Sequence, residues 1–116
     1  MAQIWKVFNT TAQATGAPIW TPAAGKKIQL TSLQLGTYGS TPARLQLWFG
    51  ASGDTIYTPG TDQLVFPMSY VPSANGYPGS IYPLYTPIFC NNPDYILRIT
   101  TDGALSVDVI AYGNEF

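Results

Sequence analysis

With no histidine in the sequence, the first candidates for acid–base or nucleophilic chemistry are six carboxylates and a single thiol. The carboxylates are Asp54, Asp62, Asp94, Asp102, Asp108 and Glu115, and the thiol is Cys90. Two carboxylates about 5 to 10 Å apart are what glycoside hydrolysis requires. The chain has no histidine, which excludes the Ser–His–Asp arrangement, most zinc sites and the usual general base at neutral pH.

The local contexts of these residues favour structural roles over catalytic ones. Asp54, Asp94 and Asp102 stand in the turn sequences SGD, NPD and DG, where an aspartate bonds nearby backbone amides. Cys90 follows an apolar pair and has no histidine, lysine or arginine nearby to lower its pKa, so we expect a buried, inert thiol. Neither a phosphate-binding glycine motif nor an acidic calcium-loop pattern occurs. We therefore expect a protein that is not an enzyme and that binds no metal or cofactor.

The composition points to a surface that other proteins cover. Only 9% of the residues are charged, against about 25% in an ordinary domain. Five basic and six acidic side chains nearly cancel, so the chain lacks the basic footprint of a nucleic-acid-binding protein, and a low net charge favours association. No apolar stretch approaches the roughly 18 residues of a membrane span or forms a secretory signal. We expect no membrane partner and assembly in a cytoplasm.

Residues 68–87, MSYVPSANGYPGSIYPLYTP, are uncharged and contain four Tyr and four Pro. Three interpretations are open: a protein–protein interface, a loop that packs only on its own domain, and a sugar-binding loop. Tyrosine gives contact area at low entropic cost, and proline lowers the cost of ordering a loop. A sugar site usually adds charged or amide groups, of which this stretch offers only Asn75. The interface is favoured, with Tyr70, Tyr77, Tyr82 and Tyr85 as its residues.

The elements that must position these residues are short strands separated by Gly- and Pro-rich turns. Segments 27–35 and 43–49 alternate apolar and polar residues and predict a hairpin, with a bulge near Thr31–Ser32 where the apolar parity changes. Segments 94–101 and 104–112, joined by Asp102-Gly103, predict a second hairpin. Shorter candidate strands are 4–8, 54–57, 63–66 and 85–90, and Pro87 restricts the last to a sheet edge or a bulge. This spacing predicts a single-domain, all-β antiparallel sandwich or barrel.

The N-terminal residues 1–25 are expected to form an arm and loop outside a β-sandwich domain at 26–116. The segment IWKVF at 4–8 is extended and apolar, and the fifteen residues after Asn9 carry no strand signal. A segment tethered in this way can pair with its own sheet or add a strand to a neighbouring chain. Ile4, Trp5, Val7 and Phe8 are therefore further candidate interface residues.

The pattern resembles the small jelly-roll head decoration, or cement, proteins of tailed bacteriophages. The resemblance lies in residues 26–49, KKIQLTSLQLGTYGSTPARLQLWF, and in residues 94–112, DYILRITTDGALSVDVIAY, which end in Val107, Val109 and Tyr112. It covers about two-thirds of the chain and consists of β periodicity and turns, and residues 1–25 and 68–87 lie outside it.

The resemblance implies a jelly-roll-like sandwich and a function without chemistry. Such proteins bind the major capsid protein on the outer surface of the virion as homotrimers and stabilise the shell. Two other functions stay open: a carbohydrate- or receptor-binding module of a phage tail or fibre, and a cellular sandwich domain. Exposure of the tyrosines on an assembled particle would distinguish the first two.

Overall fold

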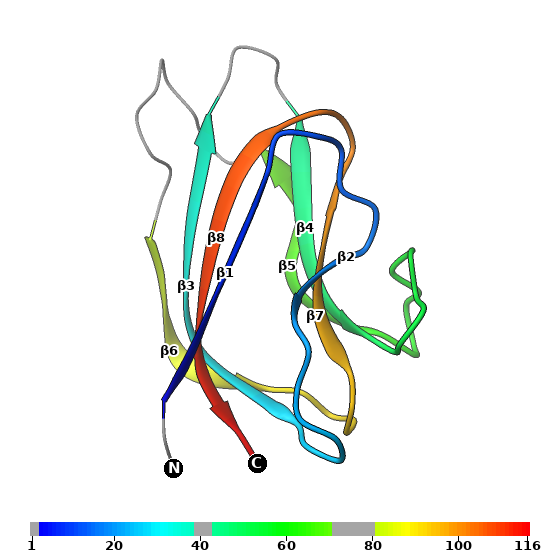
Figure 1. The fold of residues 1–116 in the computed structure, drawn as a ribbon, viewed down its shortest axis with the longest axis vertical. Coiled ribbons are helices and arrows are strands. Elements are labelled where there is room, and N and C mark those ends of the chain that lie inside the picture. Colours follow the sequence, from blue (N-terminus) through cyan, green and yellow to red (C-terminus); the bar gives the residue numbers. More distant parts are fainter. Residues whose placement is uncertain (1–2, 39–42, 71–80) are drawn as a thin grey trace.

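The computed structural model describes residues 3–38, 43–70 and 81–116, with the backbone alone for Tyr38 and residues 81–85. These residues form eight strands and no helix, which confirms the predicted all-β class. The strands, coloured along the chain in Figure 1, are β1 (Ile4–Thr10), β2 (Ala17–Trp20), β3 (Ile28–Tyr38), β4 (Arg44–Gly50), β5 (Gln63–Tyr70), β6 (Ile81–Phe89), β7 (Ile96–Thr101) and β8 (Ser106–Glu115).

The strands form two antiparallel sheets of four strands that pack face to face as a sandwich (Figure 1). We call them sheet A, in the order β1-β8-β3-β6, and sheet B, in the order β2-β7-β4-β5. Strand β1 is hydrogen-bonded to β8, β2 to β7, β3 to β6 and β4 to β5. The chain is thus folded like one long hairpin with β4 and β5 at its tip, and successive pairs of that hairpin alternate between the sheets.

Neither of the two predicted hairpins forms. Strands β3 and β4 lie in opposite sheets, and so do β7 and β8. Among the described strands, the only sequence neighbours that pair are β4 and β5. A Gly-containing turn between two alternating strands can return the chain within a sheet or carry it to the facing sheet. The Asp102 side chain joins its turn to a different strand, because its carboxylate accepts hydrogen bonds from the backbone N and the Nε of Arg44 at 2.6 and 2.7 Å.

The prediction of an N-terminal arm outside the sandwich at residues 1–25 is also wrong for those of its residues that the structure describes. Strand β1 pairs with β8 at seven successive positions, from Ile4 opposite Gly113 to Thr10 opposite Val107. Strand β2 pairs with β7 at the edge of sheet B. The arm becomes part of the sandwich because Ile4 and Phe8 point inward and pack against the hydrophobic core.

The core lies between the sheets, and its residues come from the inward faces predicted by alternation. On β4, Leu45, Leu47 and Phe49 are completely buried in it. The predicted bulge near Thr31–Ser32 is confirmed by a shift of register between Leu30 and Ser32. Strand β6 contains Pro87 and lies at an edge of sheet A, as expected, whereas residues 54–57 lie in a loop and form no strand.

The approach of β8 to β3 predicts an unequal response to two Gly→Ala changes. A Cβ at Gly113 would overlap the backbone carbonyl of Gln29 on β3, whereas a Cβ at Gly103 would lie 3.5 Å from the Cβ of Ala43. Gly113→Ala should therefore lower the free energy of unfolding by about 1–3 kcal/mol, as overpacking of an interior does. Gly103→Ala should change it by less than about 0.5 kcal/mol.

Urea unfolding followed by tryptophan fluorescence measures both changes. Equal unfolding midpoints for the two variants would contradict the close β3–β8 approach.

Candidate functional site

The outward face of sheet A carries apolar side chains on two neighbouring strands. Because side chains alternate along a strand, Ile4 and Phe8 of β1 face the core and Trp5 and Val7 face outward. The cross-strand partner of Trp5 is Tyr112, and that of Val7 is Ile110. These four outward residues form a continuous surface, which we call the apolar patch: Trp5, Val7, Ile110 and Tyr112.

The patch is accessible, and its aromatic rings are parallel. Trp5 is 62% exposed and Val7 is 57% exposed, while Ile110 and Tyr112 are partly buried. The rings of Trp5 and Tyr112 stack with centroids 6.3 Å apart and an angle of 8° between their planes. The outer strand of this ring pair, β1, thus presents an aromatic side chain that is largely open to a partner. Tryptophan and tyrosine are enriched at protein interfaces because such rings give a large contact area.

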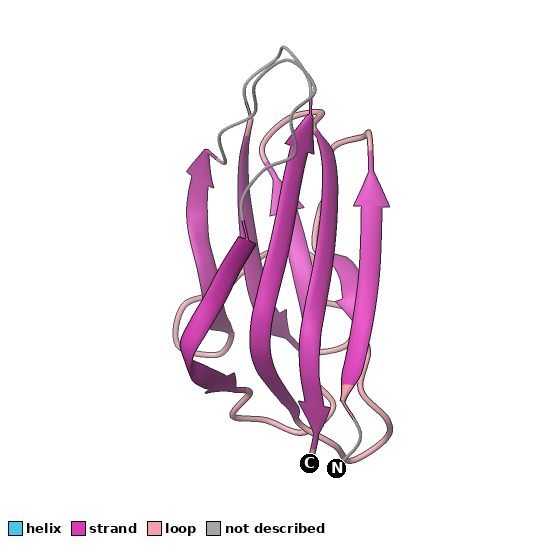
Figure 2. Cartoon of the chain, turned by 90° about the vertical axis from the view of Figure 1, so that its left-hand side faces the viewer, coloured by secondary structure: helices cyan, strands magenta, loops and turns pink. Residues whose placement is uncertain are grey.

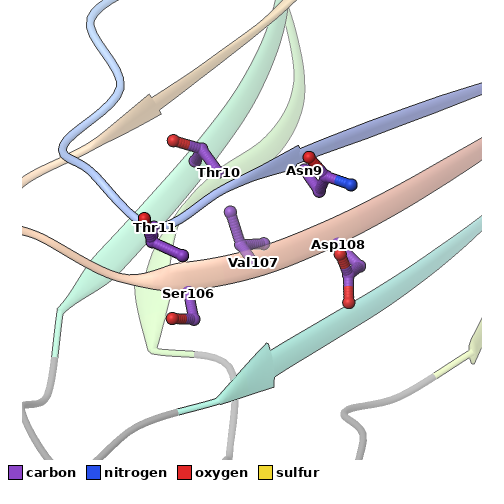
Figure 3. Close-up of a pocket in the computed structure, with 6 residues that line it drawn as sticks. All are labelled: Asn9, Thr10, Thr11, Ser106, Val107 and Asp108. Carbon is purple, nitrogen blue, oxygen red and sulfur yellow. The ribbon is translucent and has the colours of Figure 1, made fainter.

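A polar hollow of about 600 Å³ lies at the other end of the same two strands (Figure 3). Its lining residues are Asn9, Thr10, Thr11, Ser106, Val107 and Asp108. Ser106 and Asp108 point to one side of β8, and Val107 points to the other (Figure 3). Asn9 and Asp108 are cross-strand partners, so an amide and a carboxylate stand next to each other beside the apolar patch. These groups can both donate and accept hydrogen bonds from a hydroxylated ligand.

The structure brings together only part of the interface predicted from the sequence. Trp5 and Val7 lie together on the outer face of sheet A, whereas Ile4 and Phe8 are partly buried against the core. Tyr70 is 65% exposed at the end of β5, in the other sheet. Tyr77 lies outside the described residues, and Tyr82 and Tyr85 belong to β6 without described side chains.

Ile110 and Tyr112 were missed as candidate site residues, although the sequence holds a signal for them. In segment 104–112 they lie on the face opposite to that of Val107 and Val109. Two other residues on their face, Ser106 and Asp108, are polar. Apolar residues on the face of a strand that does not line the core mark a surface with another use.

The outer face of sheet B differs because a loop covers it. Trp48 points away from the core, as alternation predicts, yet it is completely buried. The ring of Tyr57, in the loop after β4, packs edge-on against the Trp48 ring with the two centroids 6.2 Å apart. The guanidinium carbon of Arg98 lies 5.9 Å from the centroid of the Trp48 ring. Arg98 donates hydrogen bonds to the carbonyls of Gly16 and Ala51 at 2.7 and 2.9 Å. Sheet B therefore offers no comparable aromatic surface among the described residues.

Two of the carboxylates named above lie close together in this covering loop. Asp54 accepts a hydrogen bond from the backbone N of Ala51 at 3.0 Å, and Asp62 accepts one from that of Thr58 at 2.8 Å. Burial raises the pKa of Asp62 above its ordinary value, and the nearby negative charge of Asp54 raises it further. Each carboxylate closes its own turn, in agreement with the structural role expected for Asp54.

Asp94 and Glu115 are also held by hydrogen bonds to other parts of the chain. Asp94 accepts a hydrogen bond from the backbone N of Gly25 at 2.6 Å, and Glu115 accepts one from Trp20 Nε1 at 2.8 Å and one from the backbone N of Ala23 at 3.0 Å. Burial raises the pKa of the Cys90 thiol, as expected for an inert cysteine. Within residues 3–38, 43–70 and 81–116, no three metal-binding side chains cluster. No described helix is long and apolar enough to span a membrane.

The raised pKa of Asp62 predicts that Asp62→Asn raises the melting temperature at neutral pH. A carboxyl whose pKa is higher in the folded state stabilises the fold below its unfolded pKa, and this contribution is lost as the pH rises through the folded pKa. Asparagine removes the charge and keeps an oxygen that can accept from Thr58. Thermal unfolding should show the gain at neutral pH and little gain at pH about 3, where aspartate is mostly protonated.

Asp102→Asn is the control with the opposite sign. The hydrogen bond from Arg44 holds the pKa of Asp102 below its ordinary value, so its contribution is present above the unfolded pKa and is lost as the pH falls. This variant should lower the melting temperature at neutral pH. Shifts in the same direction for both variants would show that these two charge environments are assigned wrongly.

Comparison of the chain with protein-family models, with curated proteins and with solved structures gives no match.

Proposed function

We propose that this chain is a non-enzymatic structural protein of a bacteriophage particle, a capsid decoration protein. In this proposal it sits on the outer surface of the assembled shell as a homotrimer, binds the major capsid protein and stabilises the shell. The observation that carries the proposal is the apolar patch, with Trp5 62% exposed and stacked on Tyr112. An accessible apolar patch with exposed Trp5 and Val7, on a chain with few charges, fits a protein that is covered by a partner.

We also propose that the sandwich is a jelly roll. The nested pairing of β1 with β8, β2 with β7, β3 with β6 and β4 with β5 supports this, because a jelly roll is a long hairpin rolled into two sheets. Jelly rolls of eight strands occur in viral capsid proteins and in lectins. This architecture is compatible with a shell protein, but a fold alone does not imply a function, so the patch carries more weight.

The patch fits shell contact because it combines a rigid scaffold with an apolar surface. Tyr112 and Ile110 belong to β8, which lies between β1 and β3, so this half of the patch is held by hydrogen-bonded strands on both sides, while Trp5 and Val7 are held by the pairing of β1 with β8. Little ordering entropy is lost when such a surface docks. Three linked copies would bind a shell much more tightly than one copy, because the second and third contacts form within one complex.

The first test is the binding of the purified protein to assembled heads made from its major capsid protein. Trp5→Ser should weaken binding by roughly 2 kcal/mol, about thirtyfold, as expected for the loss of a central aromatic contact. Ile56→Ser is the matched control, since Ile56 is 71% exposed in the loop over sheet B. Co-sedimentation across a dilution series measures both.

Two results would contradict the proposal. One is equal binding by the Trp5 and Ile56 variants, which would exclude the patch as the contact. The other is the absence of any binding by the unchanged protein. Light scattering adds a check on the trimer, for which the expected mass is three chains or a multiple of three.

A second candidate function is a carbohydrate- or receptor-binding module of a phage tail or fibre. The polar hollow favours it, because Asn9 and Asp108 offer an amide and a carboxylate on the same outward face as the exposed ring of Trp5, which lies four residues away along β1. Sugar hydroxyls bind such groups, and sugar rings stack on aromatic faces.

A glycan array tests this candidate. If the module binds sugar, Asp108→Asn should lose most of the signal with an unchanged melting temperature, because Asp108 is exposed. An array without signal would remove the candidate, and so would a signal that this substitution leaves intact.

A further inference from the structure

The four sheet edges of the sandwich differ in how well they are protected against pairing with another strand. An edge strand presents unpaired backbone N–H and C=O groups, and a proline removes one of the donors. Strand β2 contains Pro18, β5 contains Pro67, and β6 contains Pro83 and Pro87. Strand β1 contains neither proline nor glycine over its seven residues. It is the one edge without this protection.

Strand β1 is also accessible on its outer side. It is the first strand of sheet A, and within the described residues its backbone pairs only with β8 (Figure 2). Figure 2 shows it at one border of the sheet that faces the viewer, with no other described strand beyond it. Two of its outward side chains, Trp5 and Val7, are more than half exposed. Its only charged residue is Lys6.

We propose that this edge pairs with the same edge of a second copy, as two antiparallel β1 strands related by a two-fold axis at Val7. Residues directly opposite each other in an antiparallel pair point to the same face. The outward residues of both copies therefore lie on one face only when the two residue numbers of each pair add up to an even number. Centring the axis on Val7 sets Ile4 opposite Thr10 and Trp5 opposite Asn9. It is the register in which all seven residues of β1 are paired.

Charge and continuity favour the same register. An axis at Lys6 would set two ammonium groups directly opposite each other, which destabilises a strand pair. An axis at Val7 sets Lys6 opposite Phe8 of the second copy, and β1 holds no carboxylate or second lysine. The two sheets A would then form one eight-stranded sheet, and the two apolar patches would become neighbours on one face. Backbone hydrogen bonds would supply affinity, as in other cases of strand addition.

This contact goes beyond the proposed decoration function. It is isologous, with the same surface on both copies, so it closes a pair and cannot close a trimer. In a trimer of this chain it would link one trimer to the next, and without a trimer it would make a dimer.

Disulfide trapping tests the pairing and its register together. In an antiparallel pair, residues directly opposite have Cα atoms about 4.5 to 5.5 Å apart, which a disulfide can bridge. Val7→Cys should therefore form a band of twice the chain mass on a non-reducing gel after mild oxidation. Asn9→Cys is the matched control on the same exposed face, since its two copies would stand four residues apart, about 13 Å. The native Cys90 is buried and should form no band.

The results separate the pairing from the proposed function. A band for Val7→Cys without one for Asn9→Cys supports the pairing. Bands of equal strength, or no band for either variant, overturn it. Light scattering gives a second measure: Val7→Lys, with two lysines at the axis, should weaken the pairing at least tenfold, and Val7→Thr should keep it. If neither variant changes the mass, the pairing is wrong, and shell binding by the unchanged chain still decides the proposed function.

Discussion

The pairing of the last strand with the third determines the rest of this structure. Strand β8 runs along β3 at ten positions, from Ile28 opposite Glu115 to Tyr38 opposite Ser106, and its other side holds β1. Sheet A therefore has β8 at its centre, and strands far apart in the sequence must meet before that sheet can form. The absence of a side chain at Gly113 lets the two backbones approach, because a Cβ there would meet Gln29. Bringing two distant strands together costs loop entropy, and this cost comes before the packing that offsets it.

The same strand links the core to the surface. Val107, Val109 and Ala111 are buried between the sheets, while Ile110 and Tyr112 face outward in the apolar patch. The two outer faces of the sandwich have different uses. In sheet B the outward tryptophan, Trp48, is buried under a loop to which Arg98 donates a hydrogen bond. In sheet A the outward tryptophan, Trp5, remains accessible. The proposed shell contact and strand pairing both depend on this asymmetry.

Much of the fold class could be predicted from local patterns. Alternation placed Leu45, Leu47 and Phe49 in the core, the change of parity located the bulge at Thr31–Ser32, and Pro87 restricted its strand to an edge. The two hairpins and the N-terminal arm were predicted wrongly. Pairing partners far apart in the sequence leave no local trace, and a turn such as Asp102-Gly103 has the same sequence whether the chain stays in one sheet or crosses to the other. Trp5 and Val7 were among the predicted interface residues, but their cross-strand partners Tyr112 and Ile110 were not.

The sequence by itself determined the low charge of the chain, and it indicated the positions of the turns and the inward or outward side of most strand residues, because turns and alternation depend on neighbours a few positions away. Only the tertiary structure decided which strands meet, which edge stays open and which outward residues are covered. Trp48 and Trp5 illustrate the difference: both point outward from a strand, yet one is completely buried and the other 62% exposed. Their exposure differs because the loop after β4, which Arg98 binds at the carbonyl of Ala51, lies over sheet B, whereas β1 lies at an edge of sheet A. Neither arrangement follows from nearby residues.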